Sequence, residues 1–326
     1  MKRLLVVLAF LVSGVGLAQS LTVYSGRNEE FIAPVVEAFT AETGMAVEVR
    51  YGDTAELAAT ILEEGPNSPA DVFLAQDAGA LGALAKADLF TELPDAVLER
   101  VEPRFRSADG LWVGVTGRAR VLAYNTGVYT ADTLPESIFD LTDEAYRGRV
   151  GWAPTNGSFQ AFVTAMRVLE GDDRTREWLT GMIDNDVQVY ADNSSQLEAL
   201  GRGEIDLGLV NHYYLYRYLT EQGETFPVRN HYFGDADLGS LINVAGAGIL
   251  GTTDQAEDAQ AFVTYLLGED AQKSFTDTVF EYPLVGGVEP NVQLLPLSDI
   301  ETPDLDLSNL DDLEGTLELL AEVGAL

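Results

Sequence analysis

The 326-residue chain contains no cysteine, which excludes a disulfide, a thiolate nucleophile, a Cys-ligated zinc site and an iron–sulfur cluster. Its only histidines are His212 and His231, so a His-rich metal site is excluded and histidine-based catalysis has little to work with. Basic residues are also scarce, since 19 Lys and Arg stand against 53 Asp and Glu, for a net charge of −34. So large a negative charge repels a phosphate backbone and argues against a nucleic-acid-binding protein.

Lysine is nearly absent even among the basic residues, with Lys2, Lys86 and Lys273 as its only instances. Strong acidity with little lysine is favoured in high-salt habitats, where carboxylates stay hydrated and salt screens their repulsion. An Arg-rich, high-GC genome would produce part of the same bias. The content of 46% hydrophobic and 22% charged residues is ordinary for a folded globular protein. At roughly 150 residues per domain, the length suggests about two domains.

A short apolar run lies at the amino terminus. Lys2 and Arg3 precede apolar residues 4–12, and small residues follow up to Ala18. This order is typical of a signal peptide, predicted over residues 1–18. The run is shorter than the roughly 20 residues of a membrane span, and there is no cysteine to carry a lipid. We therefore expect an exported monomer that is periplasmic or otherwise extracytoplasmic and does not span the membrane.

Alternating strand and helix patterns run through the mature chain. Apolar strands are predicted at 21–24, 45–51 and 70–74, with helices between them that stop at Gly44 and Gly65. The pattern returns with strands at 149–152, 187–190 and 204–210, while residues 241–250 resemble a crossover segment and 305–320 a surface helix. Repeated βαβ units predict an α/β fold with doubly wound sheets, whose ligands bind beyond the carboxyl ends of the strands.

Polar loops follow several of these strands and form candidate anion sites. They contain Ser25, Gly26 and Arg27; Asn156, Gly157 and Ser158; and Asn193. Backbone N–H groups, hydroxyls and amides at such junctions bind anions, although simple helix capping explains the same residues. Arg27 and Arg118 are candidates to hold an oxyanion bidentately, with a surface or ion-pair role as the alternative for each.

Tyr213 and Tyr214 follow the strand at 204–210. Adjacent helical residues point about 100° apart, so the two cannot both be core residues on one helix face. At a strand-to-helix junction two phenols can converge, and the positive helix end favours tyrosinate. Two phenolate oxygens suit a hard, highly charged cation. The alternative is a pair that only packs, since the chain has 13 tyrosines. We expect His212 to support the pair or lie at the surface.

The order of motifs resembles the periplasmic ferric-iron-binding proteins of ABC transporters, which are type 2 periplasmic binding proteins of the bacterial transferrin kind. The resemblance covers essentially the whole mature chain, and its most specific element is the tyrosine pair. The matching segments are Thr22–Arg27, Ser68–Phe73, Gly117–Val121, Pro154–Phe159, Gly203–Asp206, Asn211–Tyr214 and Glu281–Leu284.

This resemblance implies two α/β lobes with a ligand cleft between them, which closes by hinge motion on binding. Lobe one is expected at 20–118 plus 244–294 and lobe two at 119–243 plus 295–326. The implied function is capture of Fe3+ with a synergistic anion (carbonate, phosphate or citrate) and its delivery to an ABC permease in the inner membrane, without enzymatic activity. Tyr213 and Tyr214 match the ferric ligands. The matching anion-binding or cleft positions are Ser25, Gly26, Arg27, Gln76, Arg118, Asn156, Gly157, Ser158, Asn193 and Asn211.

Two departures from the family pattern concern the metal ligands. Asn28 stands where some members have a histidine ligand, and Gln76 where they have a glutamate. Other members use a third tyrosine in the segment that matches 156–159, which here contains Phe159 but no tyrosine. The remaining coordination positions are therefore expected to belong to anions or water, gathered by Arg27.

Two other functions compete with ferric binding. A protein of the same fold could bind a phosphonate, a polyamine or thiamine, with the tyrosines as aromatic walls. A secreted hydrolase is the third candidate, but the sequence has no Gly-x-Ser-x-Gly nucleophile motif and its two histidines lie in unpromising contexts.

Overall fold

The computed structural model describes residues 20–326, so the signal peptide predicted at 1–18 lies outside the described residues. The first half of the α/β pattern forms as expected, with β1 paired in parallel with both β2 and β3. Its elements are β1 (Leu21–Ser25), α1 (Glu29–Thr43), β2 (Val47–Tyr51), α2 (Thr54–Glu64), β3 (Val72–Ala75) and α3 (Ala78–Lys86). We call the part of the molecule built on β1–β3 the first lobe.

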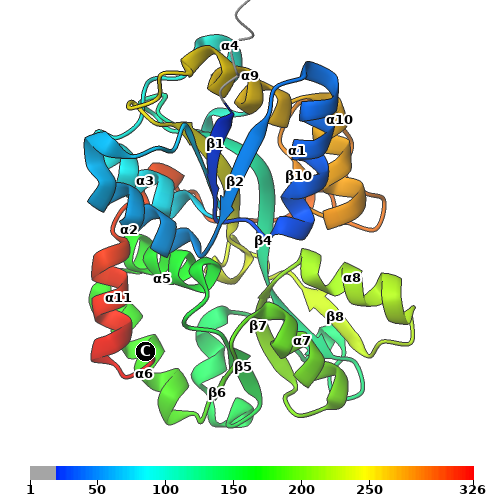
Figure 1. Cartoon of the computed structure of the whole chain (residues 1–326). Coiled ribbons are helices and arrows are strands. Elements are labelled where there is room, and N and C mark those ends of the chain that lie inside the picture. Colours follow the sequence, from blue (N-terminus) through cyan, green and yellow to red (C-terminus); the bar gives the residue numbers. More distant parts are fainter. Residues whose placement is uncertain (1–19) are drawn as a thin grey trace, which may run out of the picture.

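A second parallel unit forms the lower part of the view in Figure 1, and we call it the second lobe. Here β5 pairs in parallel with β6 and with β7. Its elements are β5 (Val150–Trp152), α5 (Gly157–Glu170), α6 (Asp172–Asp184), β6 (Gln188–Val189), α7 (Asn193–Arg202), β7 (Leu207–Asn211) and α8 (Tyr213–Gln222).

The two lobes are joined by the long strand β4 (Val113–Asn125), which passes from one to the other (Figure 1). Its first part pairs antiparallel with β9 (Ile242–Ile249), and its last part pairs with β7 and β8 (Val228–His231). Hydrogen bonding is therefore continuous in the order β2-β1-β3-β9-β4-β7-β5-β6. The segment expected as a crossover is thus a regular strand, and the parallel units meet through antiparallel strands.

Burial follows from this position of the central strands. Every residue of β3 and of β9 is buried, as expected for strands covered on both faces by helices. On α1 the buried residues recur at helical spacing, from Phe31 to Phe39, and pack against the first lobe's sheet. The remaining elements include α4 (Asp95–Leu98), α9 (Ala256–Leu266), α10 (Glu269–Ser274), β10 (Tyr282–Pro283) and α11 (Leu313–Glu322).

The carboxyl-terminal segment contacts both lobes. The expected surface helix is α11, which lies beside α5 in Figure 1. Asp312 at its start pairs with Arg167 of α5 in the second lobe at 2.9 Å. The preceding residue, Asp311, pairs with Lys86 of α3 in the first lobe at 3.0 Å. This segment therefore links the two lobes in addition to the crossing strands.

Gly26 allows α2 to start directly against the loop after β1. A methyl group on Gly26 would lie 2.0 Å from Thr54 Oγ1 and 2.8 Å from Thr54 Cα, so the backbone would have to move. We expect Gly26→Ala to lower the free energy of unfolding by about 1–3 kcal/mol, measured by urea denaturation. Gly286→Ala is the control, because nothing lies within 4 Å of its added methyl group. Equal stability of the two variants would contradict this packing argument.

Candidate functional site

A cavity of about 590 Å³ lies between the lobes. The first lobe contributes the loop after β1, the end of β3 and the start of α2, and the second lobe contributes the starts of α5, α7 and α8. Its lining includes the predicted site residues Gly26, Gln76, Asn156, Gly157 and Tyr214. Several helices therefore begin at this cavity, and their unpaired N–H groups favour an anion.

The tyrosine pair lies at the start of α8, as predicted. The two rings stack with their centroids 4.3 Å apart and 27° between their planes, so the two side chains lie against each other. Tyr213 is fully buried and Tyr214 is 7% exposed. Burial raises the pKa of Tyr214 well above its usual value and the neighbouring Tyr213 raises it further, whereas Arg27 and Arg118 lower it. A cation that binds the Tyr214 oxygen must therefore displace its phenolic proton, as a highly charged metal ion does.

Unpartnered donors surround this pair. All three guanidinium nitrogens of Arg118 are buried and have no hydrogen-bond partner within residues 20–326, and the same holds for Nδ2 of Asn193 and of Asn211. The Tyr213 hydroxyl is also buried without a partner in that range. Because buried polar groups are normally paired, this concentration of free N–H donors indicates a place for an anion.

Arg118 and Asn211 also line a small cavity of about 10 Å³ together with Arg120. The guanidinium of Arg120, unlike that of Arg118, is hydrogen-bonded within residues 20–326. Arg120 donates to the backbone oxygens of Leu209 at 3.3 Å and Ser158 at 2.5 Å. Burial and the neighbouring Arg118 lower the pKa of Arg120 to about 9. The two arginines thus lie side by side: Arg120 donates to backbone oxygens, whereas the donors of Arg118 have no partner among the described residues.

Arg27 is partly committed to the protein itself. Its Nη2 lies 2.6 Å from Oε1 of Glu281, which is fully buried and also accepts a 2.7 Å hydrogen bond from Thr116 Oγ1. The positive charge of Arg27 still acts on Tyr213 and Tyr214. Arg27 therefore faces the phenols as a fixed charge, and one of its nitrogens is not available to an anion.

Asn156, in the loop before α5, both caps that helix and lines the cavity, so the two roles considered for this loop are compatible. Asn156 Oδ1 accepts the N–H of Ser158 at 3.1 Å and so caps α5, while the residue also lines the cavity. Asn193 Oδ1 accepts the backbone N–H of Asn211 at 3.2 Å, which orders the Asn193 side chain, while the amide nitrogens of both residues have no partner within residues 20–326. Ser25 is buried, and its hydroxyl accepts the N–H of Arg27 at 3.2 Å, a structural role.

His212 supports the tyrosine pair and is not at the surface. It is fully buried, its Nδ1 accepts the N–H of Ala119 at 3.1 Å, and Nε2 lies 2.9 Å from the Phe280 oxygen. Burial lowers its pKa to about 3, so it is neutral at physiological pH. Both ring nitrogens are used, which fixes the residue that precedes the pair.

Two buried carboxylates near the site were not predicted from the sequence. Asp77 caps α3 through Ala80 N at 3.2 Å and faces Arg118, which lowers its pKa against the larger raising effect of burial. Glu281 holds Arg27 from the far end of the chain. In the sequence, Asp77 follows the predicted site residue Gln76, and Glu281 begins the matching segment Glu281–Leu284. These neighbouring motifs were the only features that could have drawn attention to the two carboxylates.

The lobes also touch beside the tyrosines. Arg217 of α8 donates to both carboxylate oxygens of Glu30 in α1, at 2.9 and 3.0 Å. The Phe31 ring of α1 meets the Tyr213 ring edge-on, with centroids 6.1 Å apart. The phenols thus lie at a contact between the lobes.

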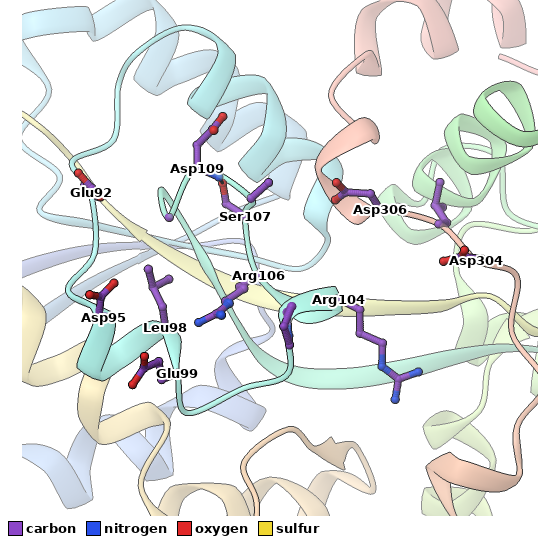
Figure 2. Close-up of a pocket in the computed structure, with 14 residues that line it drawn as sticks. Glu92, Asp95, Leu98, Glu99, Arg104, Arg106, Ser107, Asp109, Asp304 and Asp306 are labelled. Atoms are coloured by element: carbon purple, nitrogen blue, oxygen red, sulfur yellow. Dashed lines mark hydrogen bonds between the residues drawn. The ribbon is translucent and has the colours of Figure 1, made fainter.

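A larger cavity of about 720 Å³ opens elsewhere, between residues 92–110 and residues 304–306 of the carboxyl-terminal segment (Figure 2). Asp95 and Glu99 stand on one side of it, and Asp304 and Asp306 on the other. None of the unpartnered buried polar atoms in residues 20–326 lines it. Residues 20–326 contain no group of three His, Asp or Glu side chains placed to hold a metal ion. Of the residues with unpartnered donors in this range, Arg118 and Asn211 line instead the small cavity of about 10 Å³, so the predicted site residues that line a cavity divide between that one and the larger interlobe cavity.

The fold and site define a solute-binding protein of the bacterial periplasmic type. Residues 67–301, more than half of the chain, match the family model described as bacterial extracellular solute-binding protein, and the chain belongs to this family. It is 33% identical over 321 residues to an Fe(3+)-binding periplasmic protein of Serratia marcescens, covering 98% of this chain and 94% of the relative. It is 32% identical to the major ferric iron-binding protein of Neisseria meningitidis, with 93% and 92% covered.

Solved structures agree with this placement. Iron-bound HitA from Pseudomonas aeruginosa superposes with a TM-score of 0.89 at 36% identity, over 94% of this chain and 99% of HitA. A Trichodesmium protein (IdiA, FutA) in complex with iron and citrate gives 0.81 at 27% identity, over 94% and 99%. The predicted two-lobe fold and the family resemblance are confirmed.

Proposed function

We propose that this protein captures ferric iron through Tyr213 and Tyr214 in the interlobe cleft, together with a small oxyanion. One observation carries the proposal: two buried, stacked phenols lie near N–H donors of Arg118, Asn193 and Asn211 that have no partner in the part of the chain the structure describes. Phenolate oxygens are hard donors that suit a trivalent ion, whereas N–H groups cannot bind a cation and need an acceptor such as the oxygens of a small oxyanion. The relatives named for ferric binding support the same assignment.

The oxyanion follows from charge and from the donors. Two phenolates leave a ferric ion with one positive charge, and Asn28 and Gln76 contribute none. A carbonate, phosphate or citrate held by Arg118 and the amides of Asn193 and Asn211 would balance this charge while filling coordination positions. Citrate lies with iron in the related Trichodesmium structure.

The wider role proposed is that of a carrier in an ABC uptake system. The protein would act outside the cytoplasmic membrane as a monomer and hand its ion to a membrane permease, without catalysing a reaction. Related proteins named as periplasmic support the location. Within residues 20–326, every helix is too short or too polar to cross a bilayer.

The competing function, binding of a phosphonate, polyamine or thiamine against aromatic walls, is less well supported. An aromatic wall must offer a ring face to its ligand. The Tyr213 ring is fully buried, stacked on Tyr214 and met by the edge of Phe31. Its hydroxyl has no hydrogen-bond partner within residues 20–326, which favours a ligand that binds to the phenolic oxygen.

A visible absorption spectrum tests the proposed function. Addition of ferric citrate to the mature protein should give an orange-red phenolate-to-iron charge-transfer band, absent with Ga3+, which binds similarly but cannot accept the electron. In anion-depleted buffer the band should weaken and return when carbonate, phosphate or citrate is restored singly. No band at any anion concentration, with thermal stabilisation by a polyamine or phosphonate instead, would overturn the proposal.

A further inference from the structure

The two first-lobe positions that match metal ligands in the family pattern carry the uncharged residues Asn28 and Gln76. A ferric ion takes about six hard donors, and the two phenols both belong to the second lobe. On the first-lobe side the cavity is lined by the neutral amides of Asn28 and Gln76. A carboxylate at this wall would complete the set of protein ligands.

Asp53 is a carboxylate at this wall that does not cap its own helix in the described part of the chain. It is the N-cap residue of α2, yet its side chain makes no capping hydrogen bond. The aspartates that cap α3, α7 and α11 (Asp77, Asp192 and Asp312) each accept a backbone N–H, which is the usual reason for Asp at this position. Asp53 instead lines the interlobe cavity together with Tyr214, which is itself more than nine-tenths buried.

The start of α2 is fixed directly against the two strand ends that carry Asn28 and Gln76. Thr54 Oγ1 donates to the Gly26 oxygen at 3.3 Å and accepts the N–H of Gln76 at 3.1 Å. Because Gly26 has no side chain, this approach is possible. Asp53 is therefore one residue away from contacts to both strand ends.

We propose that Asp53 is a first-lobe carboxylate ligand of the ferric ion, opposite Tyr213 and Tyr214, and this rests on the proposed function. Two phenolates and one carboxylate neutralise a trivalent ion, which offsets the absence of charge at positions 28 and 76. The oxyanion would then fill coordination positions, with its own charge balanced by the Arg118 guanidinium, which has no hydrogen-bond partner within residues 20–326. An ion bound this way bridges the two lobes. Other carboxylates on the cavity wall are placed differently: Asp192 accepts the N–H of Ser195 at 2.8 Å, and Glu56 lies within the first turn of α2.

The test compares three charge-removing variants of the mature protein: Asp53→Asn, with Glu56→Gln and Asp192→Asn as matched controls. We expect Asp53→Asn alone to lower ferric affinity by at least about 10-fold in a citrate competition, as even indirect ligand contacts cost this much. Its charge-transfer band should move to longer wavelength, because a ferric ion that loses an anionic donor becomes more electron-poor. In a further variant, Asp53→Ala, added acetate should partly restore the band by supplying the missing carboxylate. Without iron, all variants should unfold at the wild-type midpoint.

The outcomes separate this inference from the proposed function. A wild-type protein without any band contradicts ferric binding itself. A normal wild-type band, with Asp53→Asn indistinguishable from wild type, overturns only the role of Asp53. Equal loss in all three variants, with no band shift in Asp53→Asn, also overturns it, because the cavity would then respond to its total charge alone.

Discussion

Tyr213→Phe and Tyr214→Phe are each expected to lower ferric affinity by at least about 100-fold. Loss of a residue that only hydrogen-bonds to a metal ligand already costs up to about 100-fold, so loss of a ligand itself should cost no less. Each substitution deletes one phenolate oxygen and keeps the ring, so the stacked pair and its contact with Phe31 persist. The iron-free protein should not be destabilised by Tyr213→Phe, because the Tyr213 hydroxyl is buried without a partner in residues 20–326. The measurements are iron titration by visible absorption and thermal unfolding without iron.

Tyr218→Phe is the matched control on the same helix. Its hydroxyl donates to the Ser194 oxygen at 3.2 Å and lies on the side of α8 that faces α7. This variant should keep the wild-type charge-transfer band. Wild-type ferric affinity in both Tyr213→Phe and Tyr214→Phe would contradict the assignment of the phenols as ligands.

Much of this site could be predicted from the sequence because its residues follow strands. Parallel strands bring their carboxyl ends to one edge of a sheet, so the loops with Asn156, Asn193 and Tyr213 had to lie near one another. The donors of Arg118, Asn193 and Asn211 that have no partner in the described part of the chain are all at positions expected to bind an anion. The roles of these residues came from the family resemblance, and remain proposals.

Other features depend on contacts that no local pattern carries. Arg27 meets Glu281 across 254 residues of sequence, so its commitment to an ion pair was not visible. Residues 242–249 are rich in Ala and Gly, a composition that gave no strand signal, yet they are held between β3 and β4. The free carboxylate of Asp53 was likewise hidden, because Asp before a helix normally predicts a cap.

Arg118 and Arg120 should respond in opposite ways to substitution by methionine. Arg120→Met removes hydrogen bonds to the Leu209 and Ser158 oxygens, and we expect it to destabilise the iron-free protein by about 2 kcal/mol or more. Arg118→Met removes a buried guanidinium whose nitrogens have no partner within residues 20–326. Its desolvation is not offset by hydrogen bonds, so the iron-free protein should be at least as stable as wild type. Loss of the charge that faces Asp77 limits the gain.

Ferric affinity should show the opposite pattern to stability: Arg118→Met should lower it and Arg120→Met should not abolish its carbonate dependence. This contrast distinguishes a residue that binds the anion from one that supports the fold. Without Arg118 the oxyanion loses the donor group best suited to hold it bidentately, so ferric affinity in carbonate buffer should fall and cease to depend on the carbonate concentration. Urea denaturation without iron and ferric titration at two carbonate concentrations measure the two effects for each variant. Arg120→Met protein that remains folded should keep a carbonate-dependent affinity. If Arg118→Met destabilises the iron-free protein as much as Arg120→Met does, and its ferric affinity still rises with carbonate, Arg118 serves the fold and the anion is held by other donors.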